Sequence, residues 1–211
     1  VQPKMVYISN PTEVGTIYTK AELTALSETC HKYGLYLFLD GARLGYGLAA
    51  PDNDLTLPDI AALCDVFYIG GTKVGALFGE AVVIKNPELA QDFRYLIKQN
   101  GGMLAKGRLL GLQFDALFTD GLYQEISAHA IAMAEKLREA FTAKGYNYLA
   151  PNRTNQIFVI VPDAHLAKIS ERFEYSYDQR IDATHSCVRF CTGWATKEEN
   201  VDALIRCVEK L

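Results

Sequence analysis

The sequence LYLFLD at residues 35–40 decides the fold of this chain. Its apolar and aromatic residues follow one another without polar interruption, a pattern typical of a parallel strand buried on both faces. The run ends on Asp40, a carboxylate placed where the strand gives way to a loop. A second such run, DVFYI at residues 65–69, is followed by Gly70-Gly71-Thr72 and then by Lys73. Ligands of parallel α/β sheets bind at the edge where the strands end, so both side chains are candidates for a binding site.

Helical and strand patterns alternate around these two runs. Thr19-Lys20-Ala21-Glu22 forms a capping box, and the apolar residues after it repeat at helical spacing until Gly34. A short helix is expected at residues 58–63, and MVYIS at residues 5–9 and AVVI at residues 81–84 are two further strands. This alternation predicts an α/β fold with a mainly parallel sheet and helices.

The pattern changes in the second half of the chain. One helix is expected at about residues 88–118, interrupted at Asn100-Gly101-Gly102, and another at residues 122–144. Two β-rich runs follow, at residues 156–161 and 186–192. Strands without alternating helices indicate a second structural unit of the α+β class.

A last helix is predicted after Thr196-Lys197-Glu198-Glu199, which reads as its cap. The residues predicted to form its buried face are Val201, Leu204, Val208 and Leu211. We therefore expect two domains, one at residues 1–121 and a small C-terminal domain at residues 122–211.

Composition excludes several classes of function. The chain is 49% hydrophobic and 22% charged, as is usual for a globular protein with a sizeable core. Its formal net charge is −4, without a run of Lys or Arg suited to nucleic acid or to an anionic membrane. No stretch approaches the roughly 18 apolar residues of a membrane span. The start, Val1-Gln2-Pro3-Lys4, lacks a signal-peptide hydrophobic region and an initiator Met, so we expect the chain to begin inside a longer protein or after processing.

Cysteine usage points to the cytoplasm and away from metal binding. No Cys-x-x-Cys occurs, and no nearby His completes a zinc set of the usual spacing, so no metal site is expected. Reduced, mostly buried thiols fit a cytoplasmic protein. The cysteines are Cys30, Cys64, Cys187, Cys191 and Cys207.

Lys73 and Asp40 together suggest a cofactor. A Lys amine can form a Schiff base with an aldehyde, and an Asp can pair with a pyridinium nitrogen, which is the minimum that a protein contributes to pyridoxal 5′-phosphate (PLP) chemistry. Taken singly, Lys73 is also consistent with a solvated loop residue, and Asp40 with a helix cap or turn former. Their shared position at strand ends favours PLP as the cofactor.

Segments spread along the chain resemble the threonine aldolase/β-eliminating lyase family of fold-type I PLP-dependent enzymes, in the order found there. The resemblance covers nearly the whole chain and implies a fold-type I α/β fold, in which residues 1–121 are the C-terminal part of the large PLP-binding domain. The matching segments are LDGARLG at 39–45, GTKVGA at 71–76, KQNGGMLAKG at 98–107 and VRFCT at 188–192.

The resemblance implies roles for individual residues. Asp40 matches the Asp that binds the pyridine nitrogen, and Lys73 matches the Schiff-base Lys. Arg43 and Arg189 match two arginines that bind the substrate carboxylate, and Asn10 sits where the family has an Asn near the cofactor ring. Simpler interpretations stay open for the arginines: Arg43 could pair with an acidic neighbour, and Arg189 could be a surface charge on an edge strand.

The chain departs from the family pattern at the cofactor phosphate. Leu104 follows Gly101-Gly102-Met103 where the family has an Arg, and the next basic residue is Lys106. The family's first third, with its phosphate loop and the aromatic ring stacked on the cofactor, has no counterpart here. We expect Lys106, with Lys98 or Arg108, to approach a phosphate at a subunit boundary of a homodimer or homotetramer; solvated lysines are the alternative.

The resemblance implies cleavage of a β-hydroxy-α-amino acid, threonine or allo-threonine, into glycine and an aldehyde. The partners expected are thus a small amino-acid substrate and further copies of the chain, without nucleic acid or membrane. A β-eliminating lyase or an aminotransferase would share Asp40 and Lys73, and an inactive oligomerising fragment is a third possibility. No residue stands out as the base for the β-hydroxyl proton.

Overall fold

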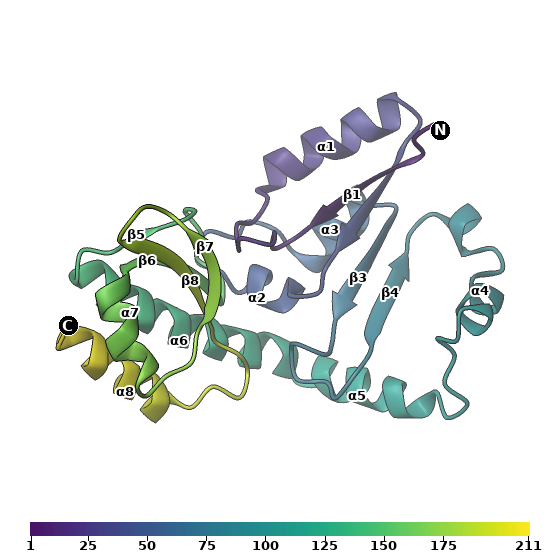
Figure 1. Ribbon diagram of the computed structural model, residues 1–211. Coiled ribbons are helices and arrows are strands. Elements are labelled where there is room, and N and C mark those ends of the chain that lie inside the picture. Colours follow the sequence, from purple (N-terminus) through teal and green to yellow (C-terminus); the bar gives the residue numbers. More distant parts are fainter.

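The computed structural model describes residues 1–211 as two β-sheets linked by a long helix, α6 (Figure 1). The strands of the first sheet, in spatial order, are β1 (Met5–Ser9), β2 (Tyr36–Asp40), β3 (Val66–Gly70) and β4 (Glu80–Ile84). The strands of the second sheet, in spatial order, are β5 (Asn147–Tyr148), β6 (Gln156–Pro162), β8 (His185–Cys191) and β7 (Ser176–Arg180).

Helices join and cover these strands. Those of the first half are α1 (Lys20–Lys32), α2 (Leu44–Leu48), α3 (Leu57–Leu63), the 3₁₀ turn η1 (Pro87–Ala90), α4 (Phe93–Gln99) and α5 (Arg108–Phe118). Those of the second half are α6 (Leu122–Ala143), α7 (Asp163–Ser170) and α8 (Glu198–Glu209). None of them is both long and apolar enough to cross a membrane.

The first sheet is parallel along β1, β2 and β3, which confirms the predicted α/β fold with a mainly parallel sheet. The register pairs Ser9 with Asp40, so the carboxyl ends of β1 and β2 lie at one edge. Strand β4 runs antiparallel to β3. A parallel pairing needs a crossover of about a dozen residues or more. The connection at residues 71–79 is too short for one.

One face of the first sheet is packed and the other is open. Leu37, Leu39 and Phe67 point into a core that also holds Leu23 of α1 and Ile60 of α3. The predicted capping box of α1 is present, because the Thr19 hydroxyl accepts from the Glu22 N–H and the Glu22 carboxylate accepts from the Thr19 N–H. Alternate residues of the same strands face the other way, and the side chains on that face are half-buried or exposed.

Helix α6 belongs to both cores. Tyr123, Ala130 and Ile131 pack with the first sheet, whereas Met133 and Leu137 pack with the second. Because successive turns of one helix serve the two halves, the division of the chain at residue 122 stays a prediction.

The second sheet differs from the sequence prediction in several places. Helix α7 and strand β7 were not predicted, and β7 is exposed along its whole length, so no alternation of buried and exposed residues marks it as a strand. Lys197, not Thr196, is the N-cap of α8, and the Thr196 hydroxyl accepts from the Gly193 N–H instead. Strand β8 lies between β6 and β7, so the interpretation of Arg189 as a residue on an edge strand is wrong.

Candidate active site

Asp40 and Lys73 are brought together by two loops that touch backbone to backbone. The Gly70 N–H donates to the Gly41 carbonyl at 2.9 Å. A Cβ built on Gly41 would lie 2.0 Å from the Tyr68 carbonyl oxygen, and one on Gly70 would lie 2.2 Å from that of Ala42. Only glycine permits this approach, which explains why Gly follows Asp40 and why a Gly pair precedes Lys73.

Asp40 presents an ordered carboxylate at the end of β2. Its Oδ1 accepts from the Ala42 N–H at 2.9 Å, and its Oδ2 accepts from the Tyr7 hydroxyl. Partial burial acts to raise its pKa, but hydrogen bonds from Tyr68, Tyr7 and the Ala42 N–H, with the charge of Lys73, outweigh that effect. The pKa of Asp40 is therefore held below its ordinary value, and the group is ionised at neutral pH.

Lys73 stands on a loop that the second half of the chain helps to fix. Its side chain is exposed and its carbonyl oxygen accepts from the Tyr46 hydroxyl at 2.5 Å. The same hydroxyl accepts from the Trp194 N–H, beyond β8, at 3.3 Å. Tyr46 is 1% exposed. One buried phenol thus connects the Lys73 loop to the second sheet.

Asn10 lies beside Asp40, directly after the neighbouring strand β1. The Asn10 N–H donates to the Asp40 carbonyl at 2.9 Å. Its side-chain Oδ1 accepts from the Tyr18 N–H at 3.2 Å, and the residue is buried. The structure therefore brings Asn10, Asp40 and Lys73 to one sheet edge.

Arg43 and Arg189 come from the two halves of the chain. Arg43 precedes α2, and Arg189 lies on β8. Both influence the Cys191 thiol: desolvation by surrounding protein raises its pKa, while the positive charges of Arg189 and Arg43 act to lower it. Two guanidinium groups near one position suit a carboxylate, which each can bind through paired N–H donors.

Arg189 is held on several sides but retains a free donor. Its Nη1 donates to Gln156 Oε1 at 3.3 Å, and its Nη2 lies 3.5 Å from Ser176 Oγ. The guanidinium stacks over the Phe158 ring at 5.9 Å. Its Nε is buried and has no hydrogen-bond partner. A buried donor without a partner is costly to the folded chain.

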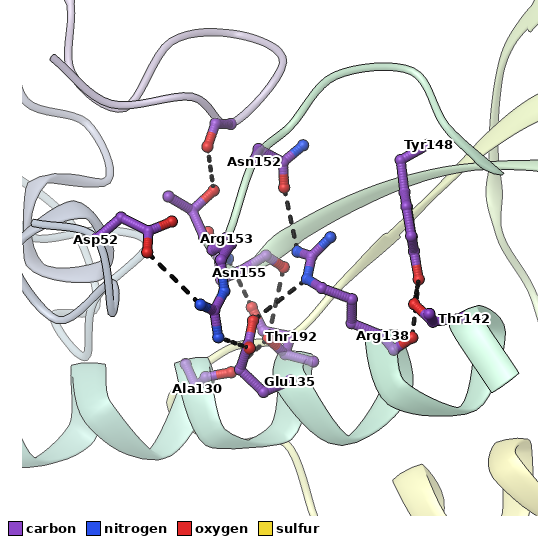
Figure 2. Close-up of polar contacts among 12 residues, drawn as sticks. Asp52, Ala130, Glu135, Arg138, Thr142, Tyr148, Asn152, Arg153, Asn155 and Thr192 are labelled. Carbon is purple, nitrogen blue, oxygen red and sulfur yellow. Dashed lines mark hydrogen bonds and ion pairs between the residues drawn. The ribbon is translucent and has the colours of Figure 1, made fainter.

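A polar clasp holds the loop at residues 149–155 against α6, as Figure 2 shows. Glu135 of α6 accepts from Arg153 and, at 3.2 Å, from Arg138 Nε. Farther along, Asn155 donates to the Thr192 carbonyl at 2.7 Å, and the Thr192 hydroxyl donates to the Ala130 carbonyl at 2.7 Å. These bonds fix the end of β8 to α6, and with it the strand that carries Arg189.

Within the chain, the basic residues predicted near a phosphate lie apart from Asp40 and Lys73. Lys98 lies in the last turn of α4, Lys106 lies two residues before α5, and Arg108 is the first residue of α5. Helix α4 stands beyond β4, on the side away from the second sheet (Figure 1). All three side chains are exposed, and none makes a hydrogen bond or ion pair within the chain. Within one chain they are not joined to Asp40 or Lys73.

Four residues around the site were missed from the sequence: Tyr7, Tyr68, Tyr46 and Gln156. The first two share strand parity with their neighbour Asp40, but this signal needs the strand register, which the sequence does not supply. Tyr46 and Gln156 act through contacts far apart in the chain, for which there was no local signal.

Comparison with known proteins identifies the family. The model of the beta-eliminating lyase family matches residues 1–164, and the chain belongs to that family. The low specificity L-threonine aldolase of Pseudomonas aeruginosa is 32% identical over 206 residues, which are 97% of this chain and 59% of that protein. The solved threonine aldolase of Leishmania major is 46% identical with a TM-score of 0.98, over 100% of this chain and 61% of that chain.

A more distant structure bears on the fold alone. A mutant aspartate aminotransferase of Thermus thermophilus has a TM-score of 0.70 at 16% identity, over 100% of this chain and 58% of that chain. These likenesses confirm the fold-type I assignment. The chain spans about three fifths of the length of the relatives it matches.

The residues at the sheet edge fit PLP. An ionised Asp40 can pair with a protonated ring nitrogen, and the exposed amine of Lys73 is free of side-chain partners. This pair of residues therefore fits the cofactor.

Proposed function

We propose that this chain carries the Lys, Asp and carboxylate-binding arginines of a PLP-dependent lyase. Its substrate would be a β-hydroxy-α-amino acid, threonine or allo-threonine, cleaved to glycine and an aldehyde. The observation that carries the proposal is the direct contact of the two loops bearing Asp40 and Lys73. The similarity to threonine aldolases from two sources supports the choice of substrate.

The chain's residues divide the work of the reaction. When bound, PLP supplies a protonated ring that accepts the electron pair left as the Cα–Cβ bond breaks. Asp40 would hold the proton on the ring nitrogen, and Lys73 would provide the amine that anchors the cofactor through its aldehyde. Asn10 lies next to Asp40 and would be close to the ring.

Arg43 and Arg189 orient the substrate. Each would bind the α-carboxylate, and gripping it from both halves of the chain fixes the direction of the Cα–Cβ bond. The β-hydroxyl loses its proton as that bond breaks, and Cα gains a proton. Glycine and the aldehyde then account for every atom of the substrate.

We also propose that the active protein is a homodimer or homotetramer. The segment from α4 to α5 exposes a group of large apolar side chains, which favours contact with another subunit. Lys98 and Lys106 lie in the same segment, where Lys106 could reach the cofactor phosphate of a neighbouring subunit. The exposed apolar residues are Tyr95, Leu96, Met103, Leu104, Leu109 and Leu112.

Two further assignments belong to the proposal. We divide the chain into residues 1–121, as part of the large PLP-binding domain, and residues 122–211, as the small domain. We place the protein in the cytoplasm, because all of the cysteines are free and three of them are buried.

Borohydride trapping tests the central proposal. In full-length protein, reduction should fix PLP to Lys73, and peptide mapping should find the label there. Lys73→Ala should abolish the label, whereas the control Lys85→Ala, at an exposed lysine just beyond β4, should retain it. Label on another lysine, or no label on the wild-type protein, would refute the assignment.

A further inference from the structure

Three neighbouring strands place two phenols around the candidate cofactor-binding carboxylate. Tyr7 lies on β1, Asp40 on β2 and Tyr68 on β3. Because Ser9 pairs with Asp40 and Tyr7 pairs with Phe38, Tyr7 is the diagonal neighbour of Asp40 on the same face. A diagonal pair is within reach of an aromatic side chain. The open face of the sheet thus directs a tyrosine at Asp40 from either side.

Phe38 holds both rings in place. The Tyr7 ring stacks on Phe38, with centroids 5.3 Å apart and planes 9° apart. The Tyr68 ring meets Phe38 from β3, with centroids 6.2 Å apart and a tilt of 58°. Such packing restricts both rings and leaves their hydroxyls close to Asp40.

The donors within the chain use only part of the hydrogen-bonding capacity of the Asp40 carboxylate. Ala42 N–H donates to Oδ1, and Tyr7 donates to Oδ2. An ionised carboxylate has about four acceptor positions, so room remains for a donor from a ligand. Ser9, the residue directly opposite Asp40, donates its hydroxyl to Glu13 instead at 2.7 Å.

We propose that Tyr7 and Tyr68 are positioning residues, which orient the Asp40 carboxylate and keep it ionised for the cofactor ring nitrogen. This inference rests on the proposed function, because it assigns Asp40 that partner. The competing interpretation is that both tyrosines only pack against Phe38. The two differ in what loss of the hydroxyls alone would do.

The charges around Asp40 set the sign of the effect. Hydrogen bonds from both tyrosines and the positive charge of Lys73 act to lower the pKa of Asp40, against the effect of burial. The hydrogen bond to Asp40 raises the pKa of Tyr7 and burial raises the pKa of Tyr68, and the charges of Glu13 and Glu80 act on them in the same direction. Both phenols therefore stay protonated as donors. Removing a hydroxyl should raise the pKa of Asp40, so that the carboxylate is lost at a higher pH on acidification.

The test replaces each hydroxyl and leaves the ring in place. Tyr7→Phe, Tyr68→Phe and the double variant are compared with Tyr36→Phe. Tyr36 is a matched control, since it lies on β2, is half-buried and makes no side-chain hydrogen bond. The PLP dissociation constant is measured by absorbance between neutral and acidic pH. In protein prepared without PLP, the Asp40 carboxyl titration is followed by ¹³C NMR.

Each single variant should shift the acid-side loss of PLP affinity to higher pH. At acidic pH the dissociation constant should rise about tenfold, as expected for losing a hydrogen bond to a charged group. The carboxyl titration should move in the same direction, and Tyr36→Phe should change neither. Unchanged titration and PLP affinity in all tyrosine variants would overturn the inference. If wild-type protein binds no PLP, the proposed function fails, while the NMR titration still decides whether the tyrosines keep Asp40 ionised.

Discussion

Asp40 and Arg189 bring opposite charges to the same candidate site, but the chain treats them differently. Asp40 receives donors on both carboxylate oxygens and sits between two loops that leave no space for a Cβ. Arg189 lies on a strand of the other sheet, bonded at 3.3 Å to Gln156, and keeps a buried Nε without a partner. Under the proposed function, Asp40 would serve a resident cofactor, whereas Arg189 would bind a transient substrate. Close backbone contact shapes the region around Asp40, whereas side-chain contacts between distant parts of the sequence position Arg189.

The largest effect should follow from filling the contact between the two loops. In Gly70→Ala the new Cβ would meet the Ala42 carbonyl oxygen at 2.2 Å, so backbone must shift. We expect a loss of about 3 kcal/mol in the free energy of unfolding, at the upper end for overpacking, together with loss of PLP. Urea denaturation measures the first and absorbance the second.

A glycine in open space is the control for this change. Gly111, in α5, has nothing within 4 Å of its built Cβ. Gly111→Ala should be neutral or stabilise the protein by a few tenths of a kcal/mol to about 1 kcal/mol. Equal stabilities of the two variants would show that the loop contact is not tight.

Arg189→Ala should break the second region and leave the first intact. Losing a charge-assisted bond to a desolvated carboxylate costs on the order of 1.5–3 kcal/mol, so kcat/KM for threonine should fall roughly tenfold to more than a hundredfold. PLP affinity should not change. Arg43→Ala should behave in the same way. Wild-type kcat/KM in both variants would remove the arginines from the carboxylate site.

Gln156→Ala should have the smallest effect and sharpens the distinction between binding and positioning. Gln156 is 1% exposed and links Arg189 to the Glu13 carbonyl, which its Nε2 approaches at 3.4 Å. Because both bonds are long, we expect KM to rise about fivefold with little change in kcat. This rise corresponds to about 1 kcal/mol, the usual net contribution of a neutral hydrogen bond. If KM is unchanged in Gln156→Ala but raised in Arg189→Ala, Phe158 stacking and the Ser176 contact position the guanidinium without Gln156.

Sequence was informative where structure depends on local pattern. The unbroken apolar run at residues 35–39 gave β2 within a residue, and Thr19 with Glu22 gave the start of α1. The antiparallel direction of β4 was not predicted, although the short connection before the strand is a local signal for it. By contrast, β7 is exposed along its length, so no burial pattern marked it as a strand.

The candidate site divides in the same way. Asp40 and Lys73 could be proposed because each follows a buried strand, and the glycines beside them are visible in sequence. The roles of Asn10, Arg43 and Arg189 were implied by the family resemblance. Their part in the reaction stays a prediction. Tyr46 could not be found, because its hydroxyl meets Lys73 and Trp194, which are remote in sequence.

Helix α6 has a mechanical consequence for the chain. Ile131 and Met133, two positions apart, pack in different cores, so unfolding of either core removes packing from the other. Because α6 is shared by the two cores, the chain should lose both cores in a single thermal transition. A rotation of the second sheet relative to the first would bend α6. The stiffness of this helix therefore limits changes in the distance between Arg43 and Arg189.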